Sequence, residues 1–417
     1  MDGSDPFRNI PNVQRLANDL STLATFTDPQ QPGFTRRPFT GPYRQARHWL
    51  RQQMQAAGLR VGLDAAGNLI AARPGSQALP PILIGSHTDT VTGGGRFDGI
   101  IGVLGGLEIV RCLDELGIDL RHPLEVVDFL GEEPTQFGVS TVGSRGMVGA
   151  LDAGLLGQQD AQGHTLREAL AELGGRPDDL AGEARQPGSI AAYLELHIEQ
   201  GPVLDQKGIA LAAVTGIAGI RRFHLTIAGQ ANHAGTTPMS LRRDALVGAA
   251  QFVCDVEGIC RAEPGAVGTV GHLMVSPNMP NVVPGRVELI AETRSIDPQT
   301  IERVEAGLRR RAEQIAGERN LSLSMNLLTD APPVQADARL LDITLEACRQ
   351  TAPAALTLPS GAGHDATQLA RIAPIGMIFV PSSAGKSHCP EEWTDMEDIA
   401  LGVQALARAL HETDRIF

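Results

Sequence analysis

The sequence predicts an α/β protein built on a mixed, largely parallel sheet with flanking helices, into which a smaller α+β domain is inserted. Two observations lead to this fold class. Four strand-like apolar stretches each run into residues of the types that bind metal ions, and a segment with a different order of elements separates the third stretch from the fourth. Ligands of an open parallel sheet bind outside the carboxyl ends of its strands, so chemically active residues are expected just after such stretches. The four stretches are residues 82–87, 124–133, 191–197 and 375–388.

Apolar spacing also predicts the elements around the first stretch. Residues at helical spacing indicate three helices, and a short alternating segment indicates a pair of strands. Residues 151–186 are polar and rich in Gly and Ala, which predicts a partly helical insertion with little chemical content. The helices are expected at residues 13–23, 42–57 and 99–116, and the strand pair within residues 60–72.

The inserted domain is predicted from the order of its elements. From about residue 215 the pattern runs strand, helix, strand, strand, helix, strand, which is the ferredoxin-like order. The sequence therefore predicts a catalytic domain of residues 1–214 and 330–417, and an inserted lid or dimerisation domain of residues 215–329. The six inserted elements are expected at residues 219–228, 240–258, 267–275, 284–293, 298–318 and 321–328. After them come a helix at 339–350, a loop at 360–365 and a closing helix at 396–410.

Composition and charge limit the kind of protein. The 417 residues are 42% apolar, enough for substantial cores, and the net charge of −13 with no basic cluster argues against nucleic acid or an anionic membrane as partner. Five cysteines without a CxxC pair favour a reducing compartment. No apolar run approaches the ~20 residues of a membrane span, and the start Met-Asp-Gly-Ser-Asp does not resemble a secretory signal. The sequence therefore predicts a cytoplasmic globular protein.

The residues that follow the four stretches suit a pair of divalent cations. Zinc-like or manganese-like ions take imidazole nitrogens and carboxylate oxygens, and a close pair of ions needs one bridging carboxylate with about two further ligands each. Asp98, expected at a helix start, is the natural bridge. A lone His at a strand end is more often a satisfied polar residue, but ligand-type residues at four strand ends favour a metal site. The predicted ligands are His87, Asp98, Glu133, His197 and His388.

Neighbouring carboxylates are expected to assist the metals. Glu132 and Glu133 point in opposite directions if their strand persists to its end, so one can bind a metal while the other acts as a general base. We assign the base to Glu132. Asp89, two residues after His87, is expected to accept the second ring N–H of that histidine and fix the imidazole.

Other chemistries have less support. The glycine run at residues 93–95 is not followed by the spacing of a phosphate-binding loop, and the chain has no GxSxG nucleophile motif. The thiol of Cys389, beside His388, is expected to fill space rather than to attack a carbonyl.

Seven motifs resemble the M20 metallopeptidase clan and, within it, the amidase/hydantoinase-carbamoylase family. That family includes N-carbamoyl-L-amino acid amidohydrolases, β-ureidopropionases and allantoate amidohydrolases. The motifs span residues 85–394 and read GSHTDTVTGGGRFDGIIGVLGGLE, DFLGEE, LELHIEQGPVLD, NHAGTTPM, NVVPGRVEL, GAGHDA and FVPSSAGKSHCPEEWT.

The resemblance implies a homodimer with two divalent ions (Mn²⁺, Zn²⁺, Ni²⁺ or Co²⁺), the same five ligands and Glu132 as base. It further implies that His233 polarises the scissile carbonyl or stabilises the developing oxyanion, either within its own chain or across a dimer interface. Arg294, helped by Asn281, would clamp the substrate carboxylate. Alternatively, Arg294 only pairs with Glu292, and Asp365 either orients a ligand or caps its loop. The implied substrate contacts are Gln200, His233, Asn281, Arg294, Gly361 and Gly363.

The implied reaction is hydrolysis of the carbamoyl C–N bond of an N-carbamoyl-L-amino acid to the amino acid, CO2 and ammonia. Alternatives are an allantoate or other ureido-acid amidohydrolase, an N-acyl-amino-acid deacylase or dipeptidase, and a non-catalytic binding protein on the same fold. The chain departs from similar sequences at Pro134-Thr135-Gln136, where a small residue and an Arg are usual, and at Lys386, where an aliphatic residue is usual. We expect substrate selectivity to depend on these positions, with Lys386 adding a positive charge or a hydrogen bond near the opening of the metal site.

Overall fold

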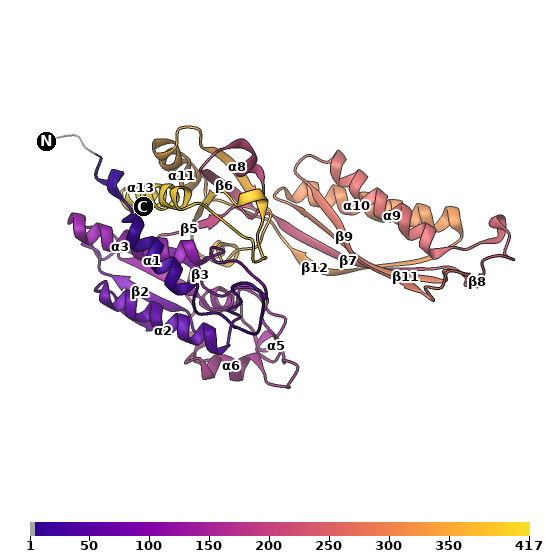
Figure 1. The fold of residues 1–417 in the computed structure, drawn as a ribbon, viewed down its shortest axis with the longest axis horizontal. Helices are drawn as coiled ribbons and strands as arrows, with labels where there is room; N and C mark the ends of the chain where they lie inside the picture. Colours follow the sequence, from indigo (N-terminus) through magenta and orange to yellow (C-terminus); the bar gives the residue numbers. More distant parts are fainter. Residues whose placement is uncertain (1–4) are drawn as a thin grey trace. The chain divides into compact units, whose positions relative to one another are not determined.

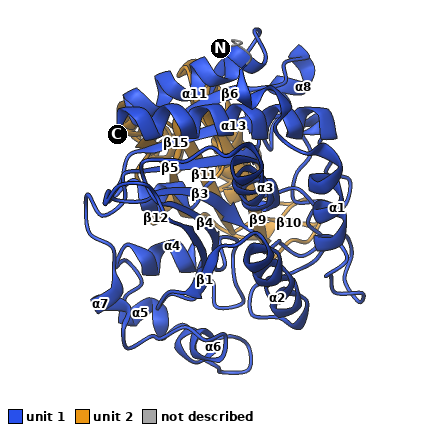
Figure 2. Cartoon of the chain, turned by 90° about the vertical axis from the view of Figure 1, so that its left-hand side faces the viewer, with its two compact units in different colours: residues 1–215, 336–358, 363–417 blue, residues 216–335, 359–362 orange. Residues whose placement is uncertain are grey.

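The computed structural model describes residues 5–417, so the first four residues, on which the prediction about a secretory signal depends in part, lie outside it. The chain divides into two compact units, coloured separately in Figure 2. Unit 1 consists of Met1–Thr215, Ala336–Leu358 and Gly363–Phe417, and unit 2 of Gly216–Gln335 and Pro359–Ala362. The sequence predicts that the chain returns to the first domain at residue 330, whereas in the structure unit 1 resumes at Ala336. Part of the loop predicted at residues 360–365 also belongs to unit 2.

Unit 1 is built on a mixed sheet with parallel strands at its centre. Within residues 5–417 this sheet has nine strands in the order β1-β2-β4-β3-β5-β15-β6-β13, with β14 paired to β6. The neighbours β4, β3, β5 and β15 run parallel, and antiparallel pairings add β2 and β1 on one side and β6 and β13 on the other. The strands are β1 (Arg60–Leu63), β2 (Leu69–Arg73), β3 (Ile82–His87), β4 (Leu124–Phe129), β5 (Ala192–Ile198), β6 (Ala212–Ile217), β13 (Val334–Gln335), β14 (Leu356–Ser360) and β15 (Ile375–Val380).

Helices cover this sheet. Every residue of β3, β5 and β15 is buried, which explains why β15 is a continuous apolar run rather than an alternating one. Helix α3 packs closely on β5 because Gly102 has no side chain: a Cβ there would lie 2.6 Å from the Leu196 carbonyl oxygen. The helices are α1 (Val13–Leu23), α2 (Gly41–Ala56), α3 (Ile100–Leu116), α4 (Val142–Met147), α5 (Ala153–Leu156), α6 (Leu166–Glu172), α7 (Leu180–Glu183), α8 (Val203–Lys207), α11 (Ala338–Thr351), α12 (Ala366–Leu369) and α13 (Met396–Ile416).

Unit 2 is an antiparallel sheet with two helices on one face. The strand order is β12-β7-β11-β9, and α9 lies beside α10 along the sheet (Figure 1). Alternate residues of β7 and β11 point into an apolar core shared with these helices. The elements are β7 (Gly219–Ala228), β8 (Asn232–His233), α9 (Ala245–Ala262), β9 (Val267–Ser276), β10 (Val282–Val283), β11 (Arg286–Ser295), α10 (Pro298–Arg319) and β12 (Ser322–Ala331).

The predicted fold class is confirmed: a mixed, mostly parallel sheet with helices, plus a separate four-stranded antiparallel sheet. Some predicted bounds are wrong. Helix α9 begins at Ala245 rather than at residue 240, because Met239–Leu241 form a 3-10 turn and Asp244 caps the helix by accepting two backbone N–H groups. Helix α13 continues past residue 410 to Ile416. None of the helices within residues 5–417 combines the length and apolar character that a bilayer crossing requires.

Candidate metal centre

The structure brings the five predicted ligands together at the carboxyl ends of the parallel strands. They form two groups in which the possible ligand atoms lie within 4.8 Å of one another, and Asp98 belongs to both groups. A carboxylate shared by two ligand groups is the arrangement that a bridged pair of ions needs. The groups are His87, Asp98 and His197, and Asp98, Glu133 and His388.

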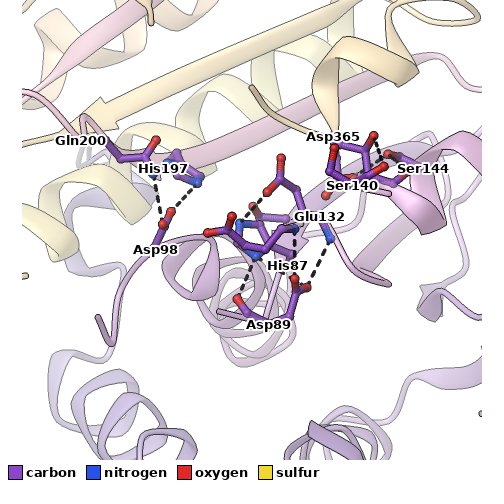
Figure 3. Close-up of polar contacts among 12 residues, drawn as sticks. His87, Asp89, Asp98, Glu132, Ser140, Ser144, His197, Gln200 and Asp365 are labelled. Carbon is purple, nitrogen blue, oxygen red and sulfur yellow. Dashed lines mark hydrogen bonds and ion pairs between the residues drawn. The ribbon is translucent and has the colours of Figure 1, made fainter. Parts of the chain in front are cut away.

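Asp98 is the centre of this arrangement. Its Oδ1 lies 3.2 Å from Nε2 of His197, and its Oδ2 lies 3.1 Å from Nε2 of His388 (Figure 3 shows the His197 contact). Burial raises the pKa of the Asp98 carboxyl, but the close approach of the two imidazoles outweighs this effect and holds the pKa well below its usual value. Nε2 of His197 is buried and has no hydrogen bond of acceptable geometry. A buried ring nitrogen that faces a carboxylate in this way fits a cation between them.

The imidazole of His87 is held against the start of α3. Gly99 has a left-handed backbone (φ +71°), and a Cβ there would lie 2.3 Å from Nε2 of His87, so only glycine allows this approach. The other ring nitrogen, Nδ1, donates to the backbone carbonyl of Asp89 at 3.1 Å. This tautomer leaves Nε2 free to bind a metal ion.

The Asp89 carboxylate does not accept the ring N–H of His87, as the sequence predicts, but has other partners. It lies 3.7 Å from Nδ1 of His87 and instead accepts the backbone N–H groups of Glu132 at 3.4 Å and Glu133 at 3.1 Å (Figure 3). Burial raises the pKa of Asp89 to about 6. Asp89 therefore fixes the histidine through its carbonyl group and the two glutamates through its carboxylate.

Glu132 and Glu133 lie in a loop rather than in a strand. Strand β4 ends at Phe129, because Gly131 takes a left-handed backbone (φ +59°) and the Leu130 N–H donates to the side chain of Asn68. Glu133 belongs to a group of possible ligands and Glu132 does not, and this difference does not come from the alternation of side chains along a strand. Glu132 is 12% exposed and places Oε2 3.8 Å from Nε2 of His87, outside both ligand groups. Burial raises the pKa of its carboxyl well above the usual range.

Gln200 contacts the ligands themselves. Its Nε2 donates to Asp98 Oδ2 at 3.0 Å and lies 3.3 Å from both Ser387 Oγ and His388 Nε2. Gln200 and His388 both have left-handed backbones, with φ of 57° and 56°. Such strain in non-glycine residues costs about 1–3 kcal/mol each and is concentrated at functional sites. Gln200, predicted to contact the substrate, thus also contacts Asp98, the predicted bridging ligand.

Unit 2 holds the predicted substrate residues Arg294 and Gly361 in contact. Arg294 donates from Nε to Glu292 Oε1 at 2.8 Å and from Nη1 to the Gly361 carbonyl at 2.6 Å. The alternative pairing of Arg294 with Glu292 is therefore present, and the same carboxylate also accepts from Arg222 at 2.9 Å. Gly363 belongs to unit 1.

His233 and Asn281 lie together in a small ribbon of unit 2. Strand β8 pairs with β10 so that His233 is opposite Val282, and the Asn281 carbonyl accepts the Ala234 N–H at 2.9 Å. The Gly235 N–H donates to Nδ1 of His233 at 3.1 Å. The neutral ring then carries its proton on Nε2, which makes Nε2 a hydrogen-bond donor.

Sequence reasoning missed three buried residues beside the ligands. The His364 ring lies 4.5 Å from the His197 ring, and burial holds the pKa of His364 well below its usual value. Glu195, His197 and His364 form a further group of possible ligands. Glu195 precedes His197 by two positions in β5, a spacing that puts both on one side of a strand and could have identified it. Glu392, four residues after His388, is buried beside Asp98.

The other uncertain positions have simpler surroundings. Asp365 is fully buried and accepts from Ser144 Oγ at 2.5 Å (Figure 3). Pro134 and Lys386 are exposed, and the Pro134 carbonyl accepts from Arg37 at 3.4 Å.

The chain is similar to known proteins over most of its length. The model of Peptidase family M20/M25/M40 matches residues 83–412. An N-carbamoyl-L-amino acid amidohydrolase of Geobacillus stearothermophilus is 44% identical over 394 residues, 94% of this chain and 96% of that protein. A ureidoglycolate hydrolase of Arabidopsis thaliana is 35% identical over 405 residues, 95% of this chain and 85% of that protein.

A solved structure shares the whole architecture. The amidase of the hydantoinase/carbamoylase family from Burkholderia multivorans superposes with a TM-score of 0.91 at 36% identity, covering 97% of this chain and 98% of that chain. The resemblance seen in the motifs is thereby confirmed. The chain belongs to the M20 peptidase family and, within it, to the hydantoinase/carbamoylase amidases, hydrolases that act on C–N bonds.

Proposed function

We propose that this chain hydrolyses the carbamoyl C–N bond of N-carbamoyl-L-amino acids, releasing the amino acid, CO2 and ammonia. The observation that carries the proposal is the largely buried Glu132 carboxyl, which lies 3.8 Å from Nε2 of His87 and outside both ligand groups. A carboxyl in that position is available for proton transfer because it is not one of the predicted metal ligands. The 44% identity to an N-carbamoyl-L-amino acid amidohydrolase supports the substrate class.

The five predicted ligands would hold two divalent ions, with Asp98 shared between them. When bound, such ions lower the pKa of a water, polarise a carbonyl oxygen and favour the ionised form of nearby carboxylates. Glu132 takes the proton of the attacking water and passes it to the leaving nitrogen. Arg294, oriented by Glu292 and Gly361, binds the substrate carboxylate through its fork of N–H donors.

His233 completes the site as the donor to the developing oxyanion, and it acts on the substrate of a second copy of the chain. Within unit 2, the ribbon that carries His233 joins β11 at Arg286, whereas Arg294 lies near the other end of the same strand. A strand rises about 3.3 Å per residue, so the stretch from Arg286 to Arg294 spans about 26 Å. An N-carbamoyl amino acid is about as long as a dipeptide, roughly 7 Å. One chain cannot place both side chains on one substrate, which supports a homodimer.

An exposed sheet edge in unit 2 also supports the homodimer. Strand β9 lies at the edge of the sheet and exposes apolar side chains, including Val267 (61% exposed) and Met274 (59% exposed). A long apolar edge strand is a template for pairing with another chain. We therefore propose that unit 2 forms the contact between the two copies.

Another ureido acid is the second candidate substrate, because a ureidoglycolate hydrolase matches 95% of this chain at 35% identity. The test is ammonia release by the Mn²⁺-loaded protein from N-carbamoyl-L- and D-amino acids, N-carbamoyl-β-alanine, allantoate and ureidoglycolate. N-acyl-amino acids and dipeptides are assayed beside them by amino-acid detection. Turnover confined to N-carbamoyl-L-amino acids supports the first proposal, and turnover of ureidoglycolate or allantoate alone supports the second. Cleavage of only the acyl or peptide substrates contradicts both.

A further inference from the structure

Glu392 connects two of the loops that carry predicted metal ligands. One of its oxygens, Oε1, accepts the backbone N–H groups of Phe97 at 2.9 Å and Asp98 at 3.1 Å. The other, Oε2, accepts the hydroxyl of Ser387 at 2.9 Å. Asp98 precedes α3, whereas Ser387 precedes His388 in the loop after β15. A single carboxylate thus holds the backbone of one ligand and the neighbour of another.

The Glu392 carboxylate is buried in a space that Gly95 leaves open. Glu392 is 2% exposed, and it is absent from both groups of possible ligands that share Asp98. A Cβ at Gly95 would lie 2.2 Å from Glu392 Oε1, so glycine at this position lets the carboxylate reach the backbone of the next loop residues. Burying a carboxylate is costly unless its oxygens are hydrogen-bonded, and both oxygens of Glu392 are.

We propose that Glu392 is a positioning residue that holds Asp98 and the Ser387-His388 loop in the arrangement that binds the metal pair. The inference rests on the proposed metal centre but not on the choice of substrate. Asp98 is the ligand common to both groups, and its side chain also contacts His388. A shift of the Asp98 backbone would therefore disturb both ions at once. Loss of an outer partner of a metal ligand costs about 10- to 100-fold in metal affinity.

The test measures how tightly the full-length protein binds Co²⁺ after a chelator has removed any bound metal. Binding is followed by the visible absorption of the bound ion. Glu392→Ala is expected to bind Co²⁺ about 10- to 100-fold more weakly than the unaltered protein. Glu392→Gln is expected to stay close to the unaltered protein, because its amide oxygen still accepts the Phe97 and Asp98 N–H groups. Its amide nitrogen can donate to Ser387 Oγ.

Asp414→Ala is the matched control. Asp414 is 3% exposed and accepts two consecutive backbone N–H groups, those of Arg121 at 2.9 Å and His122 at 2.8 Å, but it touches no predicted ligand. This variant is expected to lower the melting temperature of the metal-free protein and to leave Co²⁺ affinity unchanged. If Asp414→Ala weakens Co²⁺ binding as much as Glu392→Ala does, the effect is general destabilisation and the proposal fails.

Ser387→Ala covers the case in which Glu392→Ala does not fold. It removes the Ser387 hydroxyl from Glu392 while leaving the two backbone contacts, and it also removes the longer contacts of that hydroxyl with Asp98 Oδ2 at 3.4 Å and Gln200 Nε2 at 3.3 Å. It is expected to weaken Co²⁺ binding. Unchanged Co²⁺ affinity in Glu392→Ala, or in Ser387→Ala when the former does not fold, would overturn the positioning role. Failure of the unaltered protein to bind Co²⁺ would instead refute the metal centre itself.

Discussion

Arg294 and Gly361 are 67 positions apart in the chain, yet Nη1 of Arg294 lies 2.6 Å from the Gly361 carbonyl oxygen. The same guanidinium is held on its other side by Glu292, with Nη2 2.7 Å from Oε1. Two fixed acceptors restrict the rotamers of a side chain that otherwise has high conformational entropy. The remaining N–H groups of Arg294 are thereby preorganised for a carboxylate.

Replacing Arg294 is expected to weaken substrate binding. Arg294→Ala should lower kcat/KM by about 10- to 100-fold, mainly through KM, because a charge-assisted hydrogen bond contributes about 1.5–3 kcal/mol. Arg294→Lys keeps the charge but loses the planar fork, so it should recover only part of the loss. Steady-state kinetics on an N-carbamoyl-L-amino acid measures both. Arg222→Ala, which removes a guanidinium from the same Glu292, is the control and should have a smaller effect. An unchanged KM in Arg294→Ala would contradict the clamp.

Glu132→Gln is expected to abolish turnover while metal stays bound. The amide cannot accept a proton, and loss of a general base typically costs about 100- to 10,000-fold in rate. The measurements are kcat and metal content of the purified variant. Glu125→Gln is the control, because Glu125 lies in the preceding strand and pairs with Arg185 at 2.6 Å, away from the ligands. Turnover near that of the unaltered protein would remove Glu132 from the role of base.

Metal binding is expected to release protons. Hydrogen bonds with Asp98 and then Glu133 raise the pKa of His388 to about 11 in the metal-free protein. At pH 7 this ring is therefore protonated, whereas a metal ion binds only the neutral ring, so each ion bound there displaces a proton. Apparent affinity should rise with pH by about one logarithmic unit per pH unit for each displaced proton, while the pH stays below the pKa of the ring.

Calorimetric titration with Mn²⁺ in buffers of different ionisation enthalpy measures this release. The observed enthalpy should vary with the buffer and indicate at least one proton displaced. His272→Ala, which removes an exposed imidazole from β9, should release the same number. An enthalpy independent of the buffer would contradict the prediction.

The sequence predicts elements well where apolar periodicity is strong, as in α1 and β7, whose observed bounds match residues 13–23 and 219–228. The ligand types after the parallel strands were likewise predictable, because the rule for strand ends needs no coordinates. The Glu392 contact with Asp98 spans 294 positions and depends on tertiary structure, so no local pattern indicates it. The end of β4 was missed because it depends on a contact of Leu130 with the distant Asn68.

Mixed dimers test whether His233 acts on the substrate of the other copy. Glu132→Gln and His233→Ala should each be inactive alone, because one lacks the base and the other lacks the oxyanion donor. Co-expression with two different tags allows purification of the mixed dimer. If His233 acts across the interface, one of its two sites combines an intact Glu132 with an intact His233, and about half of the normal activity should return.

The mixed dimer of Glu132→Gln with His164→Ala is the matched control and should also have about half activity, since His164 is an exposed imidazole of unit 1 with no assigned role. An inactive mixed dimer of the His233 variant beside an active control would mean that His233 serves its own chain. In that case His233 and Arg294 of one chain would have to contact the same substrate. The stretch of β11 between Arg286, where the ribbon of β8 and β10 joins the strand, and Arg294 is about 26 Å long, which argues against this outcome. A protein that runs as a monomer at assay concentration would contradict the dimer itself.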